Sequence, residues 1–124
     1  MIYKVNKSVE TQANDVFDGK GPIFSRDIWP ADRFPKHAGK FLRYVTLPPG
    51  SILGEHVHDG NHELFFVLSG KAEADDNGKT VILEPFDVLL TGNGEHHLLN
   101  NRFDEDFVMV SCILFDDAED KEDK

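Results

Sequence analysis

Short apolar runs separated by turn residues recur along most of the chain, and helix-length amphipathic patterns are nearly absent. Regularly spaced short strands with turn signals between them are typical of an all-β sandwich or barrel. The pattern predicts about ten strands, at residues 2–5, 23–26, 41–47, 52–58, 62–68, 71–75, 80–83, 88–91, 95–101 and 106–115. At most a helical turn is expected at residues 8–17, and a loop is expected at residues 29–39, which contain two prolines.

One hairpin is marked strongly by its turn residues. Asn77 and Gly78 separate the apolar runs at 71–75 and 80–83. An Asn-Gly pair accepts the positive φ angles that a two-residue type I′ turn requires, so these two runs are expected to pair as neighbouring antiparallel strands.

The run from Leu64 to Leu68 is apolar at every position. A strand with one face in water alternates apolar and polar residues, so both faces of this strand are expected to be covered. The cover on its second face is either the N-terminal strands or a second subunit. We predict a homodimer on this ground.

The chain has 124 residues, which is the size of a single domain. Apolar residues make up 40% of it, with ten Phe, which is enough for a packed core. We divide the chain into N-terminal strands and loop at 1–40, a barrel at 41–115, and an acidic, disordered tail at 116–124. In the tail, six Asp and Glu residues outnumber two Lys residues, a composition typical of a solvated segment.

Charge and cysteine content limit the classes of partner. The formal net charge of −10 repels phosphate backbones, so no nucleic acid partner is expected. The longest apolar run has five residues, so neither a membrane span nor a signal peptide is expected. The only cysteine, Cys112, is expected to be buried and unreactive, and it fits a cytoplasmic location.

Three residues around one predicted hairpin could converge on a metal ion. His56 and His58 project from the same face of a strand, roughly 6.6–6.8 Å apart at Cα, so both rings can reach one ion. Glu63 follows the turn at 59–61, where the chain returns as the next strand. It begins an apolar run, and a buried carboxylate is costly without a partner. The trio therefore predicts a metal site rather than an exposed pair of strand histidines.

The stretch around this trio resembles the first cupin motif, G(x)5HxH(x)3–4E(x)6G. Gly50, His56, His58, Glu63 and Gly70 match it at every spacing, which makes five fixed residues across 21 positions. This resemblance is specific, and with the second motif it covers about residues 41–115.

The second cupin motif, G(x)5PxG(x)2H(x)3N, is matched less closely. Gly78 stands one residue too far from Pro85, and Phe86 occupies a position where small cupins often have Gly before the Asp. The segment at 92–93 reads Gly-Asn where Pro-Pro is common.

The second motif also indicates a fourth metal ligand. The spacing from Gly94, and Asn101 at the motif interval, favour His97. His96 and Asn100 repeat the same interval one residue earlier. A slip of one residue reverses the face of a strand, so only one of these two histidines can point inward.

The resemblance implies a double-stranded β-helix, or jelly roll, with extra N-terminal strands. It also implies one divalent transition metal (Mn, Fe, Ni, Co or Zn) held by His56, His58, Glu63 and His97. Cupins of this size include dioxygenases, decarboxylases and isomerases, so a small-molecule enzyme using the metal is expected. The alternative is a non-catalytic module that binds or senses a small molecule. A metal-free epimerase of the sugar-nucleotide kind fits less well, because this sequence keeps the full ligand set.

The residues around the ion follow from strand parity. Phe65 and Val67 share the parity of Glu63 and are expected to point inward. Arg43 would favour an anionic substrate if it faced the cavity, but we expect it to face solvent. Glu95, which shares the parity of His97, is the available acid or base beside the ligands.

Overall fold

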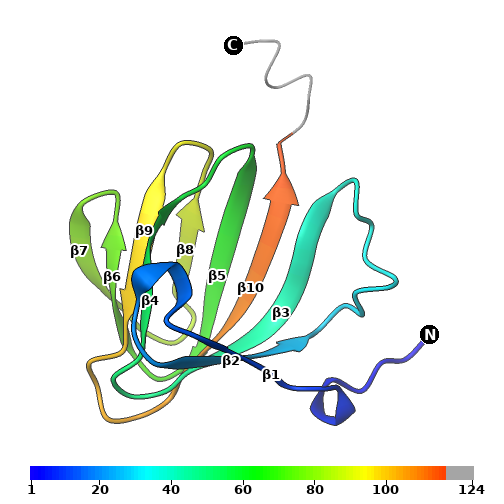
Figure 1. Ribbon diagram of the computed structural model, residues 1–124, viewed down its shortest axis with the longest axis horizontal. Helices are drawn as coiled ribbons and strands as arrows, with labels where there is room; N and C mark the ends of the chain where they lie inside the picture. Colours follow the sequence, from blue (N-terminus) through cyan, green and yellow to red (C-terminus); the bar gives the residue numbers. More distant parts are fainter. Residues whose placement is uncertain (117–124) are drawn as a thin grey trace.

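The computed structural model describes residues 1–116, which form two antiparallel β-sheets (Figure 1). The six-stranded sheet contains, in spatial order, β1 (Thr11–Asn14), β2 (Pro22–Asp27), β3 (Gly39–Leu47), β10 (Phe107–Phe115), β5 (Asn61–Ser69) and β8 (Val88–Thr91). The four-stranded sheet contains β4 (Ile52–Val57), β9 (His96–Asn100), β6 (Ala72–Asp76) and β7 (Lys79–Leu83). This is the expected all-β jelly roll.

The barrel strands lie close to the positions that the apolar pattern predicts. The hairpin of β6 and β7 turns at Asn77 and Gly78, whose φ angles of 52° and 89° are those of the expected turn. The predicted loop at 29–39 carries no strand until β3 begins at its last residue.

The N-terminal region differs from the sequence prediction. Residues 2–5 form no strand, and the 3-10 helix η1 (Val5–Lys7) begins there instead. Within the predicted helical stretch, β1 pairs with β2 and is followed by a second 3-10 helix, η2 (Val16–Asp18). All four residues of β1 are exposed, so no alternation in the sequence marks this strand.

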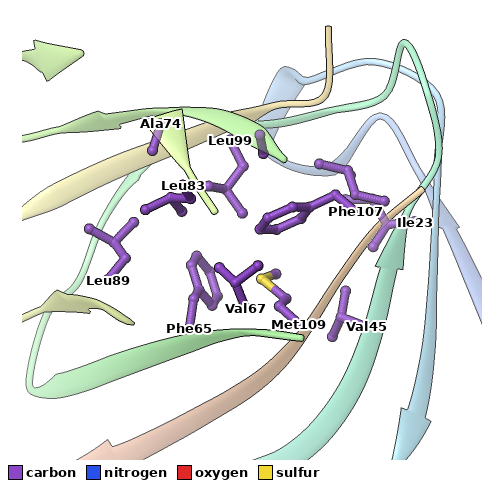
Figure 2. Packing of buried hydrophobic residues seen from close by; sticks show 12 residues of the cluster. Ile23, Val45, Phe65, Val67, Ala74, Leu83, Leu89, Leu99, Phe107 and Met109 are labelled. Atoms are coloured by element: carbon purple, nitrogen blue, oxygen red, sulfur yellow. The ribbon is translucent and has the colours of Figure 1, made fainter. Parts of the chain in front are cut away.

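Apolar side chains from both sheets fill the space between them (Figure 2). The cluster comprises Ile23, Val45, Leu47, Phe65, Val67, Ala72, Ala74, Leu83, Leu89, Leu99, Phe107 and Met109. Full burial of each large member stabilises the fold by roughly 1.5–3 kcal/mol. Phe65 and Val67 point inward, as their parity predicts.

The outer face of the six-stranded sheet is also apolar. It is formed by Leu42, Tyr44, Leu64, Phe66, Leu68, Val88, Leu90, Val108, Val110, Cys112 and Leu114, which alternate with the buried residues of their strands. Strands β1 and β2 do not cover this face, because they extend the sheet beside β3 (Figure 1). Leu90, on the edge strand β8, is 64% exposed.

Three further expectations concern the surface and the tail. Cys112 lies on the outer face and is half-buried rather than buried as predicted. The tail predicted at 116–124 falls outside the described residues except for Asp116, whose backbone N–H donates to Gly60. No helix within residues 1–116 has both the length and the apolarity to span a membrane.

Candidate metal centre

Three strands bring His56, His58, Glu63 and His97 to one point inside the barrel. His56 lies on β4 and His58 directly after it, Glu63 lies on β5, and His97 lies on β9 opposite His56. Their ligand atoms all lie within 4.8 Å of one another, so the four residues could hold a metal ion.

A β-bulge on β4 sets the direction of His56. Leu53 pairs with Leu99 and His56 with His97, so β4 has one residue more than β9 in this interval. A bulge shifts the alternation of side chains along the strand. Leu53 and His56 therefore both reach the pocket although they are three residues apart.

The separations between the ligand atoms suit a first-row divalent ion. Nε2 of His97 lies 2.9 Å from Nε2 of His56 and 3.3 Å from Nε2 of His58. Oε1 of Glu63 lies 3.0 Å from Nε2 of His58 and 3.2 Å from Nε2 of His97. Neighbouring ligands of an octahedral ion with bonds of about 2.1 Å are about 3.0 Å apart, so these distances fit.

Each of the three histidines makes a second contact at Nδ1, the ring nitrogen that faces away from the cluster. Nδ1 of His56 lies 2.9 Å from the Gly54 carbonyl oxygen, and Nδ1 of His97 lies 2.7 Å from Thr91 Oγ1. Nδ1 of His58 lies 2.6 Å from Oδ1 of Asn61. These contacts orient the three rings, as hydrogen bonds behind metal-binding histidines usually do.

The same contacts fix where the protons lie. The Gly54 carbonyl can only accept, so Nδ1 of His56 carries its proton and Nε2 offers a lone pair. The Asn61 amide nitrogen donates to the Asp59 carbonyl, which turns Oδ1 towards His58 as an acceptor. Ser111 Oγ donates to Oε2 of Glu63 at 2.9 Å, which leaves Oε1 facing the imidazoles.

The donor set therefore fits a cation. Three imidazole Nε2 atoms and one carboxylate oxygen face each other in a buried space, and such acceptors repel unless a proton or a cation lies between them. Imidazole and carboxylate are ligands that suit Mn, Fe, Co, Ni and Zn. This chemistry is the reason for assigning the cluster as a candidate metal centre.

The pKa shifts keep most of the cluster in its metal-binding form. Burial lowers the pKa of His97, opposed by Glu63, so this ring is neutral at pH 7. Burial raises the pKa of Glu63, but the three histidines that face its carboxylate together lower it far below its usual range. The hydrogen bond with Glu63 raises the pKa of His58, so this ring keeps a proton to higher pH than a free imidazole does.

The structure separates His97 from its neighbour. His97 is fully buried, whereas His96 points away from the barrel, with its Nδ1 2.8 Å from Oε1 of Glu55. His62 lies on the outer side of β5, as expected from its parity. Glu95, the sequence candidate for an acid or base, accepts hydrogen bonds from Gly92 and Asn77 at an exposed turn and does not line the pocket.

A cavity of about 500 Å³ opens onto His56, His58 and Glu63, while His97 lies buried behind them. Arg43 lines it, so the expectation that this side chain faces solvent is wrong. The reason is parity, because Arg43 stands between the inward-facing Phe41 and Val45 on β3. Its Nε contacts Asp27 at 3.2 Å and its guanidinium lies over the Phe41 ring.

The N-terminal segment supplies part of the site that sequence reasoning missed. The Phe17 ring stacks on His56 with centroids 3.9 Å apart and planes 14° apart. Phe17 has a φ of 53°, in a region that residues other than Gly seldom adopt. Thr91, Ser111 and Asn61 were also missed, because no spacing in the sequence marks residues that contact the ligands from other strands.

The comparisons with known proteins agree with this architecture. The family model described as "Cupin domain" matches residues 43–113. The chain belongs to the cupin family. Among solved structures, a Cupin 2 conserved barrel domain protein from Salinispora arenicola has a TM-score of 0.70 at 20% identity, covering 98% of this chain and 93% of its own.

Two of the similar proteins come from Thermotoga maritima. A protein named "Oxalate-binding protein" is 29% identical over 114 residues, which is 92% of this chain and 93% of that protein. A crystal structure titled as a predicted oxalate decarboxylase has a TM-score of 0.86 at 27% identity and covers 93% of this chain and 99% of its own. The resemblance to these proteins includes the N-terminal region as well as the barrel.

Proposed function

We propose that this protein is a metal-dependent enzyme that acts on a small organic acid in the cupin pocket. His56, His58, Glu63 and His97 hold one divalent transition metal in this proposal. The observation that carries it is the convergence of three Nε2 atoms and one carboxylate oxygen, with every ligand oriented by a second hydrogen bond.

A bound divalent ion supplies a Lewis acid that polarises a carboxylate or carbonyl oxygen. An ion held by these four protein ligands would still have room to bind substrate or water, which is typical of a reactive site. The chain's own residues keep the ligands in place and exclude bulk water. The Phe65 ring stacks on His97 with centroids 4.8 Å apart, and the Phe17 ring stacks on His56.

The choice of an organic acid rests on the relatives and on charge. The Thermotoga maritima protein that aligns over nearly the whole chain is named for binding oxalate. The pocket of the present chain is lined by Arg43, whose guanidinium favours carboxylates. Oxalate is therefore the first ligand to test.

A non-catalytic binding module is the second candidate. The printed name of the Thermotoga maritima relative describes binding rather than turnover. Such a module needs the same metal and the same pocket, and it differs only in releasing its ligand unchanged. The lone cysteine supports the cytoplasm as the place of either function.

We also propose that the protein is a homodimer joined through the outer face of the six-stranded sheet. A contiguous, exposed apolar face is typical of an interaction surface. Within residues 1–116 nothing covers it, since β1 and β2 extend the sheet at its edge instead. Of the two covers that the sequence left open, the second subunit therefore remains.

Incubation of the metal-loaded protein with oxalate distinguishes the two functions. An enzyme consumes oxalate with a rate that scales with metal content, and a binding module shows saturable binding by calorimetry with full recovery of the ligand. Protein stripped with chelator is the control for both. Equal binding and turnover by stripped and loaded protein would contradict the proposed role of the metal.

A further inference from the structure

The cavity is larger than oxalate. Oxalate has six heavy atoms and fills at most about 180 Å³, even if each atom is given the ~30 Å³ of a whole water molecule. The cavity holds about 500 Å³. Its wall beyond the candidate ligands is largely apolar, with Val16, Phe41, Val45 and Ile113 among the lining residues. An apolar wall of this kind suits the carbon chain of a longer ligand.

A second β-bulge places a cation on this wall. Ile113 of β10 pairs with Phe41, and the next residue, Leu114, pairs with Gly39, so Lys40 is the extra residue of β3. Strict alternation from Phe41 would place Lys40 on the outer face of the sheet. A bulge re-aims the side chain of the extra residue, and Lys40 lines the cavity instead.

The charge of Lys40 is available to a ligand. Within residues 1–116, Lys40 forms none of the ion pairs, whereas Arg43 beside it is already paired with Asp27. The pKa of His58 is raised chiefly by its hydrogen bond with Glu63, and the charge of Lys40 opposes that rise, so the ammonium acts at the same site. Asp59 is the other acidic residue that lines the cavity besides Glu63.

We propose that the pocket takes an organic dicarboxylate longer than oxalate, and that Lys40 pairs with the carboxylate distant from the metal. The near carboxylate would bind at the ion that the four ligands hold, and the carbon chain would lie along the apolar wall that includes Phe41 and Val45. Arg43 adds positive charge on the same strand. The inference rests on the proposed function, because it assumes an organic acid at a metal held by the four ligands.

The test is a calorimetric titration of the metal-loaded protein with two series of acids. One series runs from oxalate through succinate and glutarate to adipate, and the other contains the monocarboxylates of matching length. Lys40→Met removes the charge and keeps most of the side-chain volume. Lys36→Met, in the exposed loop before β3, is the matched control. Metal content and thermal stability of each variant show that ion and fold are retained.

We expect a longer diacid to bind more tightly than oxalate and more tightly than its own monoacid. Lys40→Met should weaken the longer diacid about five- to tenfold, the usual range for one partly exposed charge-assisted contact. Oxalate and the monoacids should change less than twofold, and Lys36→Met should change none of them.

Each other outcome is decisive. If affinity falls with every added methylene from oxalate onward, or if Lys40→Met leaves the best diacid unchanged, the inference is wrong and the proposed function stands. If Lys40→Met weakens the binding of oxalate as much as that of the longer acids, Lys40 does not pair with a distant carboxylate and the inference is again wrong. If no acid binds the metal-loaded protein, the organic-acid function is wrong as well.

Discussion

Nδ1 of His97 lies 2.7 Å from the hydroxyl oxygen of Thr91, and this contact points the other ring nitrogen at Glu63. Both side chains are buried, and the two strands that carry them belong to different sheets. The contact therefore couples the closure of the barrel to the direction of a candidate metal ligand.

Removing the Thr91 hydroxyl should weaken metal binding without removing a ligand. Thr91→Val keeps the shape of the side chain but leaves the His97 ring without its partner. Loss of such a contact typically lowers metal affinity by about 10–100-fold. Competition with a chromogenic chelator measures this affinity. Thr80→Val, at an exposed position of β7, is the control, and equal affinities in both variants would show that the Thr91 contact does not support the metal.

Metal affinity should fall as the pH is lowered from 8 to 6. The pKa of His58 is raised above its usual value of 6.5, so this ligand takes up a proton at a higher pH than a free imidazole does. The pKa values of His97 and Glu63 are lowered, so these two stay in their metal-binding forms over this range. Below the pKa of His58 the affinity should fall about tenfold per pH unit. The same chelator competition at pH 8, 7 and 6 tests this, and a constant affinity would contradict it.

Gly54 should tolerate no side chain. A Cβ at this position would lie 1.9 Å from the Phe17 carbonyl oxygen, because η2 packs backbone to backbone against the bulge of β4. Gly54→Ala should therefore push the N-terminal segment away from His56 and lower the melting temperature. The expected loss exceeds the ~1 kcal/mol that a strained glycine replacement costs.

Gly50→Ala separates the clash from backbone strain. Gly50 has a φ of 85°, yet a Cβ there would meet no atom within 4 Å. Thermal unfolding of both variants gives the comparison. A smaller loss for Gly54→Ala than for Gly50→Ala would show that the close contact with Phe17 is absent in solution.

The homodimer should depend on the apolar outer face. Leu90→Lys places a charge on the exposed part of the proposed interface and should convert a dimer into a monomer at micromolar concentration, as seen by analytical ultracentrifugation. Ile82→Lys, at an exposed position of the four-stranded sheet, should leave the dimer intact. A wild-type protein that sediments as a monomer would contradict the interface itself.

The barrel and the positions of three candidate ligands could be predicted from the sequence, because both depend on the alternation of inward-facing and outward-facing side chains along each strand. His56, His58 and Glu63 lie around one hairpin, so local geometry and spacing bring them together. The choice of His97 over His96 needed the second motif, and the structure places only His97 inside the barrel.

The rest depends on irregularities that alternation does not encode. The bulges at Lys40 and before His56 shift the phase of their strands, and a bulge arises from pairing with a distant strand. Strand β1 was not predicted, because none of its side chains is buried and it forms only by pairing with β2. Arg43 was misplaced because an arginine in a strand is more often solvated than aimed into a cavity.

The metal content of two neighbouring variants tests the central claim most directly. His97→Gln and His96→Gln make the same chemical change one residue apart, on opposite faces of β9. His56→Gln, at a less buried ligand, repeats the test if His97→Gln does not fold. Measured by mass spectrometry after purification, the wild type and His96→Gln should each carry about one transition-metal ion per chain, and the ligand variants should carry almost none. Equal metal content in His97→Gln, His56→Gln and His96→Gln would show that these histidines do not hold the metal.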